Sequence, residues 1–279
     1  MLEVETRGTD LVVRGVPCLS LPLTLDCGQA FRWSRLEDGR WHGVAFGLPL
    51  TIGYEGEHLV LYDTNQTDFE RVWSLYFDLE RDYPAVLARL CEDPILARAI
   101  RASRGIRILR QEPWEALCSF IISQNNNIPR IKGIISRLCE YFGEETAPGD
   151  FTFPGAERLA VLSPEDLAPL RAGFRARYII DAARRVSSGE VRLDRLSDMP
   201  LESARAELMK ITGVGIKVAD CTLLYGAGRI QVCPMDVWMK RVLAAYYPQG
   251  FPACARGVEG IAQQYLFHYA RTSGNLQVG

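Results

Sequence analysis

The sequence predicts an α+β fold, in which an antiparallel β-rich domain precedes a larger domain built mainly of helices. Over the first 65 residues apolar and polar side chains alternate, as they do in half-buried strands, and turns at 37–39, 47–49 and 55–57 interrupt the alternation. From Thr67 onward the apolar residues recur at helical spacing. We therefore place the two domains at residues 1–66 and 67–279.

Each predicted strand is a run of β-branched, aromatic or other apolar residues that ends at a turn. Short turns join successive strands and make them antiparallel. The six predicted strands are residues 11–16, 21–26, 31–36, 41–46, 50–54 and 58–62.

Proline and glycine mark several helix ends in the second domain. Asp93-Pro94 and Pro113 are typical first-turn signals, and Gly143 stops an amphipathic helix. The residues after Pro113 are mostly apolar, which predicts a buried helix. The predicted helices are 67–79, 83–91, 93–105, 113–122, 131–142, a start at Ser163-Pro164, 173–185, 203–210, 216–225, 237–247 and 260–267.

The composition is that of a globular protein in water, with 48% hydrophobic and 24% charged residues among 279. No apolar run is long enough to span a membrane and the N-terminus lacks a signal-peptide pattern, so we expect an intracellular protein. The eight cysteines show no CxxC spacing, which indicates reduced side chains and no zinc site. They stand at positions 18, 27, 91, 118, 139, 221, 233 and 254.

The formal net charge of −2 is divided unequally along the chain. Residues 1–100 carry 9 Lys/Arg and 16 Asp/Glu, a net charge of −7, and the remainder carries 23 and 18, a net charge of +5. Residues 101–137 alone hold seven basic and two acidic side chains. A positive region of this kind suits nucleic-acid binding, although a solvated charged surface would give the same counts.

A Gly-x-Gly turn, Gly213-Val214-Gly215, separates the predicted helices 203–210 and 216–225. Two short helices joined in this way form a helix-hairpin-helix. Glycine permits a positive φ, and its missing side chain lets a phosphate reach the amides that begin the second helix. Such a turn holds a nucleic-acid backbone without reading its sequence, although many helix pairs turn on glycine and bind no DNA.

Lys217 lies in the first turn of that second helix, where the helix dipole and apolar neighbours disfavour an ammonium ion. Both effects favour a neutral, nucleophilic amine, whereas a solvated surface lysine is the ordinary alternative. Cys221 is four residues further on and shares its helix face. Asp236 precedes the helical run 237–247, which is typical of an N-cap aspartate. The amine and the carboxylate flank one hairpin and one short loop, so they could converge on a single sugar.

The segments GVGIKVADC (213–221) and CPMDVWM (233–239) together resemble the helix-hairpin-helix DNA glycosylases, and most closely the 8-oxoguanine branch. The resemblance implies a helical HhH-GPD core and a base-excision-repair enzyme that flips out and excises 8-oxoguanine. It implies that Lys217 attacks C1′ as the base leaves, forms a Schiff base and permits β-elimination, as in a bifunctional glycosylase/AP lyase. Asp236 would stabilise the charge that develops on the sugar.

The resemblance extends to a base pocket shared between the two domains. CGQAFRW at 27–33 is similar to the family's GQxFRW element, which implies that the Gly28 carbonyl accepts a hydrogen bond only from the oxidised base. Gln263 and Phe267, four apart on one helix face, correspond to the pair that holds the flipped base, and Cys221 would cover its other face. A glycine turn and a core aromatic residue beside a surface glutamine are the ordinary alternatives.

Two further segments correspond to contacts with the rest of the duplex. QNNNIPR at 124–130 is similar to a stretch that fills the gap left by the flipped base, which implies roles for Asn125 and Arg130. Phe174 and Arg175 correspond to an aromatic residue that wedges into the stack and an arginine that bonds the orphaned cytosine. An inter-helix turn capped by asparagine is the alternative for the first segment.

The resemblance also bears on cofactors and partners. Several relatives carry an iron–sulfur cluster on four cysteines after the catalytic helices, but only Cys254 lies there, so we expect no cluster and no metal centre. A monovalent cation on the hairpin carbonyls stays open. The expected partner is double-stranded DNA with a damaged base opposite cytosine, bound by a monomer in the nucleoid, cytoplasm or nucleus, with no membrane.

Two other functions remain compatible with the sequence. A glycosylase for another lesion, such as an alkylated base, would keep the fold and Asp236, and a non-catalytic module would use the hairpin only to hold DNA. The sequence also departs from the family at two places, since Trp238 stands where a histidine is common and Phe174 where a tyrosine is frequent.

Overall fold

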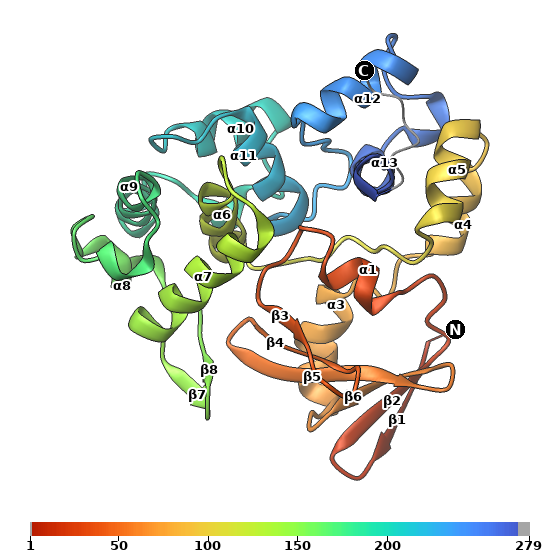
Figure 1. Ribbon diagram of the computed structural model, residues 1–279, viewed down its shortest axis with the longest axis horizontal. Helices are drawn as coiled ribbons and strands as arrows, with labels where there is room; N and C mark the ends of the chain where they lie inside the picture. Colours follow the sequence, from red (N-terminus) through yellow and green to blue (C-terminus); the bar gives the residue numbers. More distant parts are fainter. Residues whose placement is uncertain (1, 273–279) are drawn as a thin grey trace.

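The computed structural model describes residues 2–272, and its N-terminal part is a six-stranded antiparallel sheet (Figure 1). The strand order is β1-β2-β6-β5-β4-β3, so β6, the last strand of this sheet along the chain, lies between β2 and β5. The antiparallel β domain expected from the sequence is therefore confirmed. The strands are β1 (Glu3–Arg7), β2 (Asp10–Arg14), β3 (Trp33–Arg35), β4 (Trp41–Ala45), β5 (Leu48–Glu55) and β6 (His58–Tyr62).

One face of this sheet is covered by the helical segment that follows it in the chain. The turn at Gly56, with φ +59°, sets the β5–β6 register so that Ile52 pairs with Leu61, and both are fully buried. Trp33 donates through its indole nitrogen to the Tyr76 hydroxyl at 2.7 Å. The core under the sheet includes residues on both sides of the predicted domain boundary at residue 66, so that boundary stays a prediction. The helical contributors are Phe69, Trp73, Tyr76, Phe77 and Leu79.

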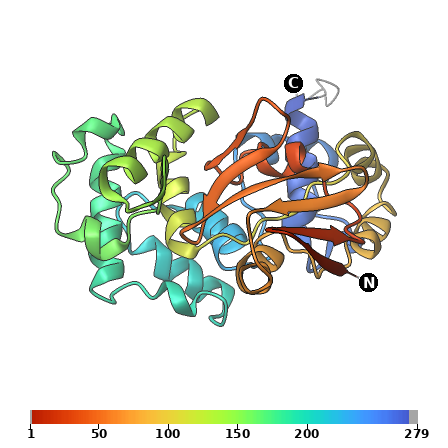
Figure 2. The ribbon, with the colours of Figure 1, turned by 90° about the horizontal axis from the view of Figure 1, so that it is seen from below.

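The helices fall into two groups (Figures 1 and 2). One group contains α6 to α11, and in the other α13 packs against α5 and α12, which joins the C-terminal helix to an early one. The first helices are α1 (Leu21–Leu25), α2 (Gln66–Asp68), α3 (Ser74–Tyr76), α4 (Tyr83–Leu90), α5 (Pro94–Ala102), α6 (Pro113–Ile122) and α7 (Ile128–Phe142). The later ones are α8 (Ala156–Ala160), α9 (Arg175–Ser187), α10 (Leu201–Met209), α11 (Ile216–Cys221), α12 (Val237–Tyr246) and α13 (Glu259–Thr272).

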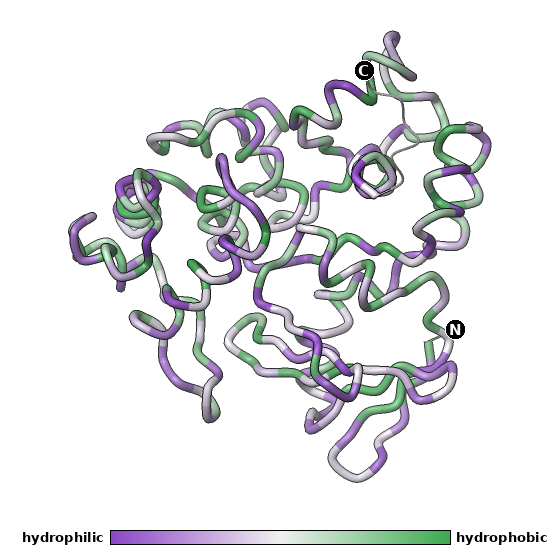
Figure 3. Tube along the Cα trace, in the orientation of Figure 1, coloured by the Kyte–Doolittle hydropathy of each residue, from purple (hydrophilic) through white to green (hydrophobic). Residues whose placement is uncertain are grey.

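Most of these helices are amphipathic, and Figure 3 shows hydrophobic and hydrophilic residues alternating along α4, α5 and α7. The exception is α6, in which every residue from Trp114 to Ile122 is buried. This central helix carries the loop that precedes α7 at its C-terminal end. Short π-helical turns η1 (Phe69–Trp73) and η4 (Thr222–Gly226) continue α2 and α11, and 3-10 turns stand at η2 (Ala168–Leu170), η3 (Leu193–Arg195) and η5 (Ala253–Ala255).

Several local features of the structure differ from the predictions. The run Leu21–Leu25 is the helix α1, because Pro22 suits a first helical turn and cannot donate to a sheet ladder. Strand β1 was missed because it pairs only with β2 at the sheet edge and is largely exposed, so it lacks apolar alternation. The hairpin β7 (Glu145–Ala147) and β8 (Asp150–Phe151) was also missed. Ser163-Pro164 begins a turn in place of a helix.

Candidate active site

Lys217 and Asp236 line one open cleft of about 610 Å³ between the N-terminal segment, the α6–α7 loop and the C-terminal helices. A smaller inner pocket of about 60 Å³ continues from it and shares Gly28, Lys217, Asp236 and Phe267 with the cleft. Cys221 and Gln263 line this inner pocket. The structure therefore brings together all six residues that the sequence assigns to catalysis and to the base pocket.

Of the two hairpin glycines, Gly213 is the one whose position requires glycine. Gly213 has φ +81°, and a Cβ atom there would lie 2.5 Å from the Tyr178 ring, so both the backbone and the close approach require glycine. Gly215 has φ −98° and no neighbour near its Cβ direction. It is the N-cap residue of α11 and leaves the approach to the helix amides open. The side chain of Val214 is buried, so only its backbone faces outward.

Lys217 projects from the first turn of α11 toward the end of α6. Its Nζ atom lies 3.5 Å from the Ser123 hydroxyl and 5.3 Å from the centre of the Phe120 ring. Burial raises the pKa of Cys221 to about 11, although the neighbouring Lys217 opposes this shift. The Cys221 side chain is therefore a neutral thiol at physiological pH, suited to lie against the face of a base.

Asp236 is the N-cap residue of α12, as the sequence predicts. Its Oδ1 atom accepts a hydrogen bond from the Met239 amide at 2.7 Å, which satisfies one of the free amides at the helix start. This bond holds the carboxylate at the wall of the cleft, where it lines the same space as Lys217. Trp238, two residues further on and 41% exposed, also lines the cleft.

The inner pocket contains an unpaired polar atom. Gln263 is only 4% exposed, and its Oε1 atom has no hydrogen-bond partner among the described residues. A buried acceptor left unpaired costs about 1–3 kcal/mol, so this atom points to a ligand that donates a hydrogen bond. Gly28, with φ +92°, presents its backbone to the same pocket. The ring of Phe267 lies 5.2 Å from the Arg271 guanidinium at the cleft.

The three consecutive asparagines have different local roles. Asn125 is exposed with φ +48°, in the left-handed region that asparagine tolerates. Asn126 donates to the Ile122 carbonyl at 3.1 Å and holds the loop to α6. Asn127 caps α7 by accepting from the Arg130 amide at 3.0 Å. The Arg130 side chain is exposed, as its predicted contact with DNA requires.

Arg175 occupies a different position from the one that its predicted contact with an orphaned base suggests. It is only 3% exposed, and its guanidinium donates to the backbone carbonyls of Gln124, Asn125 and Ala172. Burial and the nearby Arg130 lower its pKa. Phe174 is 45% exposed and its ring lies 4.5 Å from the Arg175 guanidinium. Arg175 thus supports both the asparagine loop and the exposed ring.

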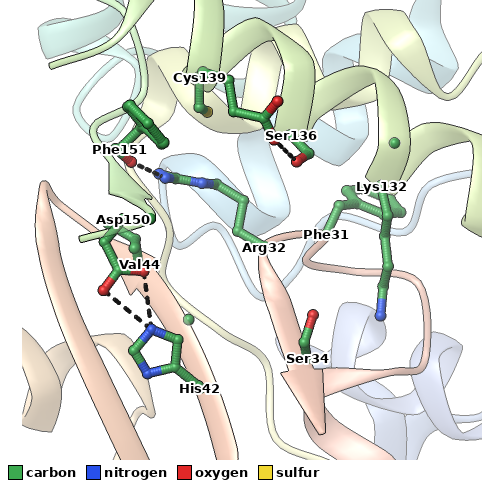
Figure 4. A pocket seen from close by; sticks show the side chains of 14 residues that line it. Phe31, Arg32, Ser34, His42, Val44, Lys132, Ser136, Cys139, Asp150 and Phe151 are labelled. Atoms are coloured by element: carbon green, nitrogen blue, oxygen red, sulfur yellow. Dashed lines mark hydrogen bonds and ion pairs between the residues drawn. The ribbon is translucent and has the colours of Figure 1, made fainter. Parts of the chain in front are cut away.

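A second large pocket, of about 400 Å³, lies between α7, the sheet and the β7–β8 hairpin, and Figure 4 shows His42 beside Asp150 and Arg32 beside the Phe151 carbonyl. His42 contacts Asp150 at 2.9 Å, and Lys132 contacts Asp26 at 2.7 Å. Arg32 donates to the Phe151 carbonyl and contacts Glu115 at 3.3 Å. These contacts join the sheet and the β7–β8 hairpin to α6 and α7, so this pocket is structural.

Several residues of the cleft escaped sequence reasoning. Phe120, Ser123 and Arg271 line it, as do Tyr225 and Gln264 in the inner pocket. Phe120 and Tyr225 read from sequence as core aromatics, and Gln264 has no periodicity that separates it from a surface glutamine. Only the pairing of α6 with η4, and of α13 with the N-terminal segment, reveals them.

The fold and the site define a helix-hairpin-helix DNA glycosylase: a glycine hairpin, a lysine and an N-cap aspartate on one cleft, and a pocket with an unpaired amide oxygen. Comparison with known proteins agrees. Residues 14–117 match the model of the 8-oxoguanine DNA glycosylase N-terminal domain, and residues 118–250 match that of the HhH-GPD superfamily of base excision DNA repair proteins. The chain belongs to the 8-oxoguanine DNA glycosylase family within that superfamily, which confirms the resemblance and the α+β architecture.

The two solved structures described below align with nearly the whole chain, and the curated relative aligns with most of it. The N-glycosylase/DNA lyase of Saccharomyces cerevisiae is 39% identical, and the alignment covers 82% of this chain and 68% of the relative. The structure of MBOgg1 in complex with a low-affinity DNA ligand is 44% identical, with a TM-score of 0.92 and coverage of 99% and 100%. The Clostridium acetobutylicum 8-oxoguanine glycosylase/lyase, bound to duplex DNA with cytosine opposite 8-oxoguanine, is 37% identical, with a TM-score of 0.90 and 98% of each chain covered.

Proposed function

We propose that this protein is a bifunctional DNA glycosylase and AP lyase of base excision repair, which excises 8-oxoguanine from duplex DNA. The proposal rests on one observation, which is that the cleft and the inner pocket are connected. Lys217 and Asp236 line a cleft large enough for a sugar, and that cleft opens into a pocket with an unpaired Gln263 amide oxygen. The named relatives are glycosylase/lyases, which supports the same activity.

The chemistry begins at the sugar of a nucleotide flipped out of the duplex. The Lys217 amine forms a bond to C1′ while the bond from C1′ to the base nitrogen breaks, and the base leaves with that electron pair and takes up a proton. The Asp236 carboxylate stabilises the positive charge that develops on the sugar. Ring opening gives a Schiff base on Lys217. Loss of a C2′ proton then expels the 3′ phosphate by β-elimination, which cleaves the strand.

The inner pocket selects the base by its hydrogen-bond donors. The Watson–Crick edge of a guanine base carries N–H donors, which suit the unpaired Oε1 atom of Gln263. Cys221 and Phe267 would cover the two faces of the ring. 8-Oxoguanine carries a hydrogen on N7, and this hydrogen donates to the Gly28 carbonyl, whereas guanine would oppose that carbonyl with a lone pair. The mismatch costs about 1–3 kcal/mol in a buried site.

The proposed partner is duplex DNA with 8-oxoguanine opposite cytosine, the substrate with which the Clostridium acetobutylicum relative was determined. The amides of the 213–215 turn would contact phosphates, Asn125 and Arg130 the gap and the opposite strand, and Phe174 the base stack. We propose that the chain acts as an intracellular monomer. No helix of the described residues is long and apolar enough to cross a membrane.

We further propose that catalysis needs no iron–sulfur cluster and no metal centre, because only Cys254 of the eight cysteines lies after the catalytic helices. Among residues 2–272 no group of three or more His, Cys, Asp or Glu residues could hold a metal ion. A monovalent cation on the hairpin carbonyls would assist phosphate binding without a role in the bond changes. Dialysis against a chelator should therefore leave excision unchanged.

The test is borohydride trapping on a duplex that contains 8-oxoguanine opposite cytosine, with undamaged and alkylated-base duplexes beside it. Reduction fixes the Schiff base as a covalent adduct, which we expect only with 8-oxoguanine and only when Lys217 is present. Lys217→Gln is the informative variant. Lys210→Gln is its matched control, because Lys210 stands before the same hairpin and bonds the Glu190 carbonyl at 3.1 Å, outside the cleft.

Each alternative predicts a different result. Adducts on the alkylated-base duplex would favour a glycosylase for another lesion. Base release without an adduct would indicate a water nucleophile and would overturn the role of Lys217. Tight binding of every duplex without base release would indicate a DNA-binding module, and the proposed function would then be wrong.

A further inference from the structure

A ring of hydrogen bonds, closed through the chain between Cys27 and Gln29, borders the inner pocket, which Tyr225 and Gln264 also line. The Tyr225 hydroxyl donates to Gln264 Oε1 at 2.6 Å, and Gln264 Nε2 donates to the Cys27 sulfur at 3.1 Å. Two residues along the chain from Cys27, the Gln29 carbonyl accepts from Gln111 Nε2 at 2.6 Å. The backbone N–H of Gln111 in turn donates to the Tyr225 backbone carbonyl at 2.7 Å and closes the ring.

The ring connects the three segments that carry the pocket residues. Cys27 precedes Gly28, whose carbonyl is the proposed acceptor for the lesion. Gln264 follows Gln263 on α13, the helix that also carries Phe267. Tyr225 lies in η4, which continues the helix of Lys217 and Cys221. A change in any one of these bonds would therefore shift one wall of the pocket relative to the other two.

All of the side chains in this ring are shielded from water. Tyr225, Gln264, Cys27 and Gln111 are each at most 4% exposed, and Gln29 is fully buried. Burial raises the pKa of Cys27 to about 11, so its sulfur stays a thiol that accepts from Gln264 and donates to the Thr24 carbonyl at 3.4 Å. A bond lost inside such a network leaves its partner unpaired, which is costly at the low dielectric of the interior.

The ring is more specific than general core packing requires. The Tyr225 ring already stacks on Phe120, with centres 5.2 Å apart and planes at 18°, so its hydroxyl adds nothing to the apolar packing. Gln264 places a full carboxamide in the core, where an apolar residue of similar size would pack without any partner to satisfy. Its amide group links the Tyr225 hydroxyl to the Cys27 sulfur and so fixes the position of Cys27 relative to α13.

We propose that Tyr225, Gln264 and Cys27 are positioning residues, which hold the Gly28 carbonyl at the distance from Gln263 and Phe267 that the flipped base requires. This inference rests on the proposed function and identifies the residues that determine its base specificity. None of the three contacts the reacting sugar in the mechanism above. They therefore affect base excision and have no direct effect on strand cleavage at a site that has already lost its base.

That separation provides the experiment. Single-turnover excision is measured on the 8-oxoguanine:cytosine duplex over a range of enzyme concentrations, and β-elimination is measured on a duplex with a preformed abasic site. The variants are Tyr225→Phe, Gln264→Leu and Cys27→Ala, with Cys27→Ser as the rescue, because a hydroxyl can still accept from Gln264. Tyr265→Phe is the matched control. Tyr265 is the next residue on α13, fully buried, and donates to the Ile106 carbonyl at 2.9 Å away from the pocket.

We expect Tyr225→Phe, Gln264→Leu and Cys27→Ala to lower the saturating excision rate by about tenfold, which corresponds to about 1.4 kcal/mol in the barrier. The half-saturating enzyme concentration and the rate at the abasic site should stay within about twofold of wild type, because DNA binding and the lysine chemistry are untouched. Cys27→Ser should recover most of the loss. Tyr265→Phe should show the wild-type excision rate.

Two results would overturn the inference. Excision and abasic-site cleavage falling together in Tyr225→Phe would mean that the ring only stabilises the fold, and unchanged excision in all three variants would mean that the ring has no effect on the pocket. The wild-type measurement separates this inference from the proposed function. If the wild-type protein releases no 8-oxoguanine, the proposed function fails first and the inference fails with it.

Discussion

Arg175 offers a direct test of how the asparagine loop is built. Its guanidinium donates to the carbonyls of Gln124 at 2.8 Å, Asn125 at 2.9 Å and Ala172 at 3.2 Å. Arg175→Ala removes all three contacts. A hydrogen bond from a charged group contributes about 1.5–3 kcal/mol, but the carbonyls of Gln124 and Asn125 can bond water once they are released. We therefore expect the free energy of unfolding to fall by about 3 kcal/mol, which is less than the roughly 4.5 kcal/mol that three such bonds would contribute at the low end of the range.

The loss should appear both in stability and in activity. For a chain of this size about 3 kcal/mol corresponds to a melting temperature about 6 °C lower. Asn125 depends on these bonds to remain at φ +48°, so the loop should lose its shape and excision should slow by about tenfold.

The control is Arg177→Ala. Arg177 is exposed two residues further along α9, and its one side-chain bond is to the Tyr178 hydroxyl at 3.2 Å. We expect its stability to stay within about 0.5 kcal/mol of wild type. If Arg175→Ala melts with the wild type and loses only its preference for cytosine, Arg175 reads the opposite base and the role as a loop support is refuted.

Three further predictions concern other parts of the protein. Gly213→Ala should destabilise the fold by more than about 2 kcal/mol and weaken DNA binding, because Gly213 has a positive φ and the new Cβ would lie 2.5 Å from the Tyr178 ring. Gly215→Ala should fold normally, because no atom lies near its Cβ position. Asp236→Asn keeps a side-chain oxygen for the helix cap, so the melting temperature should be unchanged. Excision should slow by about 100-fold or more because the negative charge is lost, and a large loss of stability in this variant would contradict the prediction. Burial raises the pKa of Glu115 to about 7 against the opposing effect of Arg32, so the folded protein holds this proton more tightly than the unfolded chain. The stability that this bound proton contributes is lost as the pH rises from 4.5 toward 7. The free energy of unfolding, measured by chemical denaturation, should therefore change less between pH 5 and pH 8 in Glu115→Gln than in wild type.

The parts of the site that sequence analysis located are those with local signals. The cap at Asp236, the turn at Gly213 and the position of Lys217 one turn into α11 each follow from a few neighbouring residues. The cap of α7 is local as well, although it falls on Asn127, and the helix therefore begins three residues before the predicted start. Local propensity is sufficient where the backbone itself sets the geometry.

The features that were missed depend on contacts between distant segments. Helix α1 is fixed by the Thr24 hydroxyl, which donates to the Gly105 carbonyl at 3.0 Å, 81 residues away. Arg175 is buried because a loop 50 residues earlier supplies its acceptors, and nothing in the basic sequence around it distinguishes it from the exposed Arg177. Charge and helical periodicity predict which side of its helix a residue occupies, but they do not reveal which other segment packs against that side.

The arrangement of the pocket explains why these long-range contacts matter for the chemistry. Lys217, Gly28 and Gln263 come from three segments that no short loop connects, yet the proposed function requires a flipped nucleotide to meet all three at once. A displacement of about 1 Å at a reacting centre can cost about 100-fold in rate, so their relative positions must be fixed before DNA binds. Buried hydrogen bonds between Tyr225, Gln264 and Cys27 supply that constraint more specifically than apolar packing, because a hydrogen bond restricts both distance and direction. Selectivity for the base and cleavage of the sugar are thereby assigned to separate sets of residues, which is why variants of one set should leave the other step intact.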